Sequence, residues 1–124
     1  MRSLTVFVAV AGTAILAVPA CAQDAERGKQ LFEQCAACHS LSAGQNMLGP
    51  HLHGLFGRKS ASVADYIYSP PLRRANVVWT PELLDNFLAD PQAGQFRGNK
   101  MPFAGLPDAK ARADLVAYLK SATQ

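Results

Sequence analysis

Three segments of this chain show the spacing of apolar residues that is typical of amphipathic helices, and two long irregular stretches separate them. In the first segment, Gly28, Leu31, Phe32 and Cys35 follow one another at intervals of three and four residues. Side chains at this spacing lie on one face of a helix. The pattern therefore predicts a helix whose apolar face leads up to Cys35.

The second predicted helix has clear start and stop signals. Thr80 is a suitable N-cap, Pro81 fits the first helical position and Glu82 lies near the positive helix end. Its apolar face consists of Leu83, Leu84, Phe87 and Leu88. We expect the helix to end at Asp90, because the residue before a proline avoids the helical conformation.

The third predicted helix lies at the C-terminus. Asp108 is its expected N-cap, and the helix should continue to about Ala122. Leu115, Val116 and Leu119 are spaced so that they face inward together. No segment alternates between apolar and polar residues as a strand would, so the predicted fold class is all-α.

The stretches 40–78 and 91–107 are rich in glycine, proline and polar residues, and we expect no regular helix or strand in them. Loops of this length are unusual in a compact domain unless something else organises them. Three short helices also make a thin core for a domain of this size. The pattern therefore suggests a bound group that completes the core.

The motif Cys35-Ala36-Ala37-Cys38-His39 indicates what that group is. Two thiols separated by two residues, with a histidine directly after the second, form the attachment pattern of a c-type haem. The two sulfurs can form thioethers with one porphyrin, and His39 can bind its iron. A disulfide or a thioredoxin-like redox pair is the alternative for two close thiols, but His39 and the lack of a βαβ pattern argue against it. A buried haem would also give the long loops an apolar body to pack against.

The first residues have the composition of an export signal. Arg2 precedes an apolar stretch at 4–20, and Ala20-Cys21-Ala22 resembles a cleavage site with small residues. We therefore predict a signal peptide at 1–22, one domain at 23–124 and a periplasmic location. The alternatives are an uncleaved anchor helix, or a lipid anchor on Cys21 after cleavage before that residue.

The charge is modest and gives no indication of nucleic-acid binding. The formal net charge is +3 at neutral pH, and loss of Arg2 with the signal peptide would lower it by one. No basic run exceeds two residues, as at Arg58-Lys59 and Arg73-Arg74.

A haem iron held by His39 has room for a second protein ligand. The candidates in the exported chain are Met47, Met101, His51 and His53, and all of them follow the motif by enough residues to fold over the ring. A thioether ligand would stabilise reduced iron and raise the potential. Spacing alone leaves these four alternatives open.

From Gly28 to Thr123 the chain resembles class I c-type cytochromes, the family of mitochondrial-like and bacterial cytochromes c. The similar segments are GKQLF at 28–32, CAACH at 35–39, LGPHLHGLFGR at 48–58, YIY at 66–68, VVW at 77–79, KMPF at 100–103 and RADLVAYLK at 112–120. The resemblance implies an all-α fold in which the N- and C-terminal helices cross beside one covalent haem. It also implies that Met101 is the second iron ligand.

The resemblance implies further roles, one position at a time. Pro50 would accept a hydrogen bond from the imidazole of His39. The positions that would hydrogen-bond the haem propionates are Arg58, Tyr68 and Trp79. Phe103 matches an aromatic residue near the ring. A surface or hydrogen-bonding role is expected for His51 and His53.

The chain also departs from the mitochondrial pattern. Phe87 replaces a tyrosine whose hydroxyl approaches the methionine sulfur. Asn99 and Leu72 replace a threonine and an asparagine that belong to the distal hydrogen-bond network of the mitochondrial proteins. Lysines around the haem edge are replaced at Gln92 and Ala93, whereas Lys100 is retained.

The function implied is a one-electron carrier without enzyme activity, with haem c and iron as its cofactor. Partners of this family would be redox proteins such as a quinol–cytochrome c oxidoreductase, a terminal oxidase, a reaction centre or a periplasmic dehydrogenase. The chain would be a soluble monomer of a respiratory chain or a small subunit of a periplasmic oxidoreductase. A peroxidase-like or gas-binding haem protein is the other class, and His51 or His53 would be its acid–base group.

Overall fold

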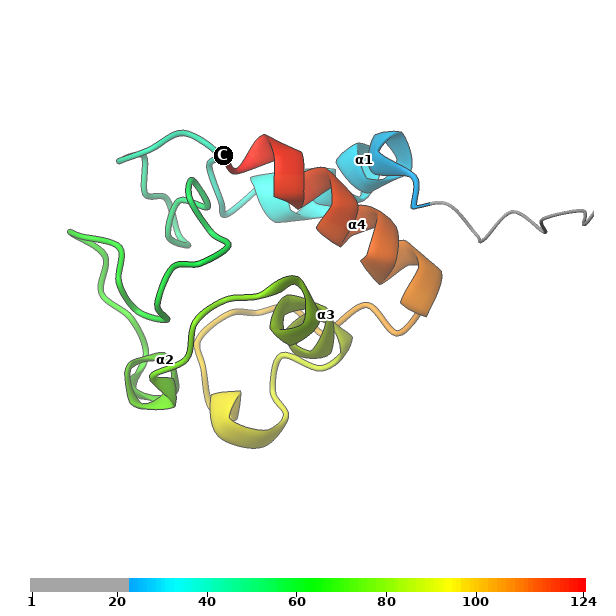
Figure 1. The fold of residues 1–124 in the computed structure, drawn as a ribbon. Helices are drawn as coiled ribbons and strands as arrows, with labels where there is room; N and C mark the ends of the chain where they lie inside the picture. Colours follow the sequence, from blue (N-terminus) through cyan, green and yellow to red (C-terminus); the bar gives the residue numbers. More distant parts are fainter. Residues whose placement is uncertain (1–22) are drawn as a thin grey trace, which may run out of the picture.

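A computed structural model describes residues 23–124, so the predicted signal peptide and Cys21 lie outside the described residues. The elements in chain order are α1 (Ala25–Ala36), α2 (Pro70–Ala75), α3 (Pro81–Ala89), the short 3-10 helix η1 (Gly94–Phe96) and α4 (Ala109–Ala122), as Figure 1 shows. Within 23–124 the extended pairing is limited to an isolated bridge between Lys59 and Val78. The all-α prediction is confirmed.

The predicted helix starts are confirmed by their caps. The side chain of Thr80 accepts a hydrogen bond from the backbone N–H of Leu83 at 3.1 Å, and that of Asp108 accepts one from Lys110 at 3.0 Å. Each cap satisfies a backbone donor that has no partner inside the helix. Asp24 caps α1 in the same way, with the N–H of Arg27 as donor at 3.0 Å.

The expectation of no regular helix was wrong for α2 within 40–78, and the short η1 also lies within 91–107. The helix α2 has two prolines in its first turn, Pro70 and Pro71, and it ends at Asn76, whose backbone is left-handed. Six residues are too few to show a helical spacing of apolar residues, so the pattern could not reveal it. Its start agrees with the preference for proline in a first turn.

The helices α1 and α4 cross where Gly28 meets the backbone of Asp114 (Figure 1). A Cβ atom on Gly28 would lie 2.8 Å from the Cβ of Tyr118 and would overlap the Asp114 carbonyl group. Phe32 packs one turn further along, with its ring centroid 5.7 Å from that of Tyr118. Glycine therefore sets the distance between the two helices.

The carboxylate of Asp114 is buried at this crossing. It accepts hydrogen bonds from the backbone N–H of Asp24 at 2.8 Å and from the guanidinium of Arg27 at 3.3 Å, and it also binds the ammonium group of Lys110. These donors keep the pKa of Asp114 below its ordinary value, and the Asp24 N–H contributes most. The first residue before α1 is thus tied to α4.

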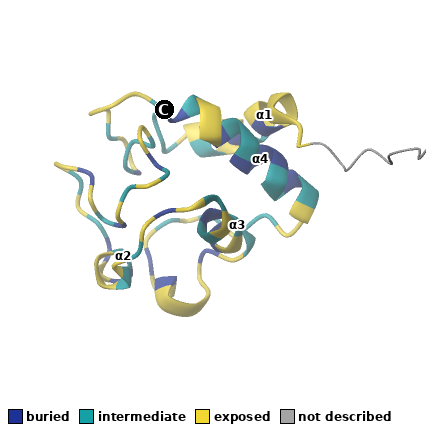
Figure 2. Ribbon diagram, in the orientation of Figure 1, coloured by how far each residue is buried: buried dark blue, intermediate teal, exposed yellow. Residues whose placement is uncertain are grey.

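The core lies where α1, α3 and α4 face one another, and Figure 2 shows the buried segments on these inner faces. Its buried members are Phe32, Leu55, Trp79, Leu84, Phe87, Leu88, Phe96, Leu115, Val116 and Leu119. Leu55 and Trp79 lie outside the helices, so the irregular stretches help to build the interior. In the part of the chain described, no helix has the length and apolar character needed to cross a membrane.

Candidate haem-binding site

A cavity of about 480 Å³ lies between the helices and the long loops. This volume is in the range of sites that hold cofactors. Most of its surface is apolar, with contributions from Phe32, Leu52, Leu55, Leu72, Trp79, Leu84, Phe87, Leu88, Leu115 and Leu119. The sequence-predicted residues that line it are Cys35, Cys38, His39, Pro50, Arg58, Tyr68, Trp79 and Met101.

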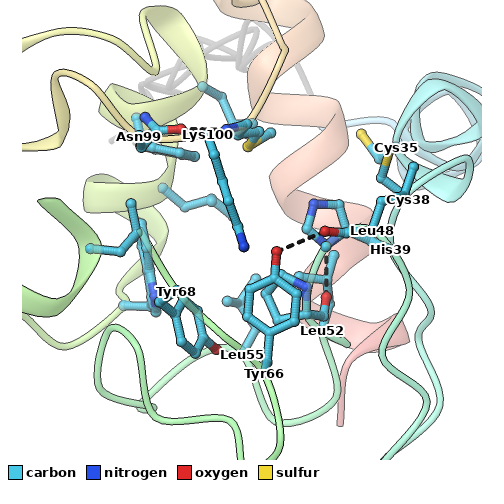
Figure 3. Close-up of a pocket in the computed structure, with 18 of the residues that line it drawn as sticks. Cys35, Cys38, His39, Leu48, Leu52, Leu55, Tyr66, Tyr68, Asn99 and Lys100 are labelled. Carbon is cyan, nitrogen blue, oxygen red and sulfur yellow. Dashed lines mark hydrogen bonds between the residues drawn. The ribbon is translucent and has the colours of Figure 1, made fainter. Parts of the chain in front are cut away.

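The end of α1 places the two thiols and His39 on the same wall of the cavity. The backbone N–H groups of Cys38 and His39 both donate to the carbonyl oxygen of Cys35, at 3.0 and 2.9 Å. These bonds continue the turn beyond the helix, so the three side chains lie together (Figure 3). Burial and the neighbouring Cys38 raise the pKa of the Cys35 thiol to about 11.

The imidazole of His39 is held in the orientation of a metal ligand. Its Nδ1 atom lies 2.7 Å from the carbonyl oxygen of Pro50. Since a carbonyl oxygen can only accept, Nδ1 carries the proton and the lone pair of Nε2 is free to bind iron. Burial lowers the pKa of His39, and the charge of Arg58 lowers it further. The hydrogen bond to Pro50 acts in the opposite direction, and the net shift of the pKa favours the neutral ring that a metal ligand needs.

Asn99 fixes the loop that carries Met101. Its side-chain amide donates to the carbonyl oxygens of Pro91 at 2.6 Å and Phe96 at 2.9 Å, and its carbonyl oxygen accepts the backbone N–H of Met101 at 2.8 Å. Asn99 is buried. The sequence identified it only as a departure from a family pattern, although an amide two residues before a candidate ligand was a usable signal.

The structure distinguishes between the four candidates for the second iron ligand. Met101 lines the cavity, whereas Met47, His51 and His53 do not. Met47 is 49% exposed. Figure 3 shows His39 on one side of the cavity and Asn99 and Lys100, which directly precede Met101, on the other.

Phe103 differs from the other predicted site residues. It is half-buried and packs against the hydrophobic core, and it is not part of the cavity lining. Phe103 therefore does not contribute to the wall of the cavity.

Arg58 brings a positive charge to the cavity. Its guanidinium donates to the carbonyl oxygens of His53 at 2.8 Å and His51 at 3.1 Å. Burial lowers its pKa, and the ion pairs among residues 23–124 do not include it. A partly buried cation without a carboxylate favours an acidic group on the ligand. Nearby, the Tyr68 hydroxyl accepts the N–H of Val63 at 3.2 Å, which leaves its own proton for another acceptor.

Two positions of the cavity lining that are polar in the mitochondrial pattern, 87 and 72, are apolar in this chain. The ring of Phe87 is buried, with its centroid 5.3 Å from that of Trp79 and 5.1 Å from that of Phe96. Leu72 lines the same cavity. Neither side chain carries a hydrogen-bond donor, so neither can bond to the Met101 sulfur.

Two bonds link the loops at the mouth of the cavity. The hydroxyl of Tyr66 donates to the carbonyl oxygen of Leu48 at 2.7 Å. The ammonium group of Lys100 lies 4.7 Å from the centroid of the Tyr66 ring and donates to the carbonyl oxygen of Ile67 (Figure 3). No local pattern predicts this arrangement, because the segments around residues 48, 66 and 100 are separated along the chain.

The residues present fit a covalently attached haem. Two thiols and a neutral imidazole lie on one wall, a thioether lies in the lining, and an unpaired cation can meet a propionate. The remaining lining is apolar, as a porphyrin requires.

Comparison with known proteins points the same way. The family model for cytochrome c matches residues 25–123. The chain is similar to cytochrome c2 of Blastochloris viridis, with 44% identity over 103 residues that cover 82% of this chain and 80% of the relative. It is also similar to cytochrome c of Euglena viridis, with 46% identity over 79% of this chain and 96% of the relative. Cytochrome c-550 of Ancylobacter novellus is 43% identical over 77% and 92% of the two chains.

Proposed function

Because this chain belongs to the cytochrome c family, it is an electron-transfer protein that carries a covalently bound haem c, and we propose that His39 and Met101 are its two iron ligands. We further propose that the exported domain at 23–124 carries single electrons between redox proteins of the periplasm. Thioether bonds to the haem are assigned to Cys35 and Cys38.

The position of Met101 in the cavity is the strongest support for the ligand assignment. Of the four candidate second ligands, Met101 alone is part of the cavity that also contains Cys35, Cys38 and His39. The bond from Asn99 to the Met101 backbone favours a fixed position for this side chain. A thioether on one side and an imidazole on the other would leave the iron no free position for a substrate.

The bound haem supplies a metal that gains and loses one electron reversibly. Three features of the chain keep the energy cost of gaining or losing this electron small. The apolar lining excludes water, the Pro50 carbonyl holds the imidazole of His39 in one tautomer, and Arg58 can neutralise a carboxylate. The arrangement provides orientation and electrostatics, in agreement with the electron-transfer role of the family.

The periplasmic location is proposed from the apolar stretch at 4–20 and the small residues at 20–22. Redox proteins are the general class of partner that the family implies. As donors we propose a quinol–cytochrome c oxidoreductase or a periplasmic dehydrogenase, and as acceptors a terminal oxidase or a reaction centre. The role in a respiratory chain is part of the same proposal.

Spectroscopy of the full chain, expressed in a host that attaches haem c and recovered from its periplasm, tests the proposal. We expect reversible reduction, a ferric charge-transfer band of methionine-to-iron type, and slow binding of cyanide or carbon monoxide. Absence of that band together with rapid binding of either ligand would refute the assignment of Met101. Retention of the holoprotein in the cytoplasm would refute the location.

A further inference from the structure

The segment that joins α3 to Met101 folds back on itself through local hydrogen bonds (Figure 1). The carboxylate of Asp90, at the end of α3, accepts the backbone N–H of Gln92 at 3.0 Å. After η1, the side-chain amide of Asn99 donates back to the carbonyl oxygen of Pro91 at 2.6 Å. The residue two positions before Met101 is therefore tied to the first residues after α3.

The side chain of Gln92 makes a second connection between the start and the end of this segment. Its Oε1 atom accepts the backbone N–H of Gly98 at 2.9 Å, and its Nε2 group donates to the carbonyl oxygen of Asn99 at 3.1 Å. Since a backbone N–H only donates and a carbonyl oxygen only accepts, these two partners fit a single orientation of the amide. Gly98 has a φ of +83°, which glycine adopts without strain. The Gln92 amide thus pairs with the backbone on both sides.

Two peptide groups separate the Cα atoms of Asn99 and Met101, and a different side chain holds each of them. The first contains the carbonyl oxygen of Asn99, which Gln92 binds. The second contains the N–H of Met101, which donates to Oδ1 of Asn99 at 2.8 Å. Because a peptide group is planar, one directional bond restricts the rotation of the whole group. Both bonds together set the direction in which the Met101 side chain leaves the backbone.

This control of the backbone matters because the methionine side chain has three rotatable bonds and adapts easily to its surroundings. The cavity wall around Met101 is mostly apolar and holds it by packing. The hydrogen bonds of Gln92 and Asn99 therefore supply the directional restraint on the position of the sulfur.

Position 92 requires a side chain that both donates and accepts. Lysine, which the mitochondrial pattern has here, carries donors only and could not accept the N–H of Gly98. Gln92 is exposed, so burial does not explain its residue type. The two-way pairing is thus a feature in which this chain departs from that pattern.

We propose that Gln92 is a positioning residue for Met101, which holds the methionine sulfur on the iron and slows its replacement by other ligands. This inference rests on the proposed assignment of Met101 as the second iron ligand. Gln92 is not part of the cavity lining. It acts through the backbone of Gly98 and Asn99, and not by contact with the bound group.

The test compares the ferric holoprotein of wild type with two variants, Gln92→Leu and Gln95→Leu. Leucine makes neither of the two hydrogen bonds and cannot bind iron, so Gln92→Leu removes the pairing without adding a ligand. Gln95→Leu makes the same change at an exposed position of η1 and is the matched control. With both axial positions occupied, cyanide binds only after the thioether has left the iron, so its binding rate reports the detachment of Met101.

We expect cyanide to bind about tenfold faster to Gln92→Leu, because two partly exposed hydrogen bonds are lost, and at close to the wild-type rate to Gln95→Leu. Equal rates in all three proteins, or an equal rise in both variants, would overturn the proposal. A wild-type protein without the methionine-to-iron band would refute the assignment of Met101 and this inference with it. A wild type with the band and an unaffected Gln92→Leu would refute the inference alone.

Hydrogen exchange followed by NMR separates positioning from a purely local role of Gln92. The N–H of Gly98 is bonded to Gln92 itself and should exchange faster in Gln92→Leu. The N–H of Met101 is bonded to Asn99, so we also expect it to exchange faster, about fivefold, because the loop opens more often. The thermal unfolding of the helices, followed by circular dichroism, should stay near wild type. Faster exchange at Gly98 alone, or a loss of helix stability large enough to explain the cyanide rate, would overturn the proposal.

Discussion

Gly49 leaves the space that the imidazole of His39 occupies. A Cβ atom at position 49 would lie 2.5 Å from the ring Cε1 and 2.9 Å from Nε2. The loop is fixed there because the N–H of Gly49 donates to the carbonyl oxygen of Cys38 at 2.8 Å. The glycine is required by a side chain packed against it and not by a left-handed backbone, since its φ is not positive.

Gly49→Ala should therefore displace the imidazole. We expect a loss of about 1–3 kcal/mol in the free energy of unfolding, which is usual for overpacking, and faster cyanide binding to the ferric protein. Urea unfolding and stopped-flow absorbance measure the two effects. Gly44→Ala is the control, because its Cβ meets no atom within 4 Å while its φ of +74° makes it strained. If both variants change cyanide binding equally, the contact between Gly49 and His39 does not position the ligand.

Met101→Ala should remove the second iron ligand. We expect loss of the methionine-to-iron band, a lower potential and rapid binding of cyanide or carbon monoxide, because a thioether stabilises reduced iron. Met47→Ala is the matched control, since Met47 is half exposed and lies outside the cavity lining. Potentiometry and absorbance spectra distinguish the two. An unchanged spectrum in Met101→Ala, or a changed one in Met47→Ala, would reassign the ligand.

Asn99→Ala should loosen the Met101 loop while leaving Met101 in the chain. It removes three hydrogen bonds of a buried side chain, so we expect a loss of about 1–3 kcal/mol in stability and a weaker methionine-to-iron band. Gln95→Ala, at an exposed position of η1, is the control. Thermal loss of the band, followed by absorbance, gives the measurement. A stability loss without any change in the band would mean that Asn99 supports the fold only.

Asp114 should make the protein sensitive to acid. Its pKa in the folded protein lies below the ordinary value of 3.8, chiefly because the Asp24 N–H donates to it and Lys110 donates further. The stabilisation is therefore complete above the unfolded pKa and is lost as the pH falls through the lower folded value. Asp114→Asn should show a smaller fall in unfolding free energy over this acid range, whereas Asp65→Asn, at an exposed position, should follow wild type. Urea unfolding at several pH values tests this, and parallel curves for Asp114→Asn and wild type would contradict it.

Most of the helices could be predicted because their signals are local. The caps at Thr80 and Asp108 act within three residues, and the predicted ends of α3 and α4 agree with the structure. The helix α2 could not be predicted from its spacing, since six residues with two prolines show no repeat. Local signals thus suffice for long helices and fail for a single short turn.

The residues of the site also divide into those that a local motif predicts and those that it does not. The motif at 35–39 could be read directly, since its two thiols and histidine lie on one turn of chain. The second ligand could not be chosen by spacing, because Met47, His51 and His53 also had the reach, and Met101 entered through resemblance to a family. The placement of Met101 in the cavity depends on the hydrogen bonds of Asn99 to distant parts of its loop.

The fold class, three helices with their caps and the chemistry of the haem attachment motif could be predicted from the sequence, because each depends on residues within one or two turns of each other. Three relations depend on the tertiary structure: which methionine lines the cavity, that Arg58 lies in its lining with no carboxylate partner among residues 23–124, and that α2 packs against η1. These relations join separate segments, so their distances are set by how the helices and the long loops pack around the cavity.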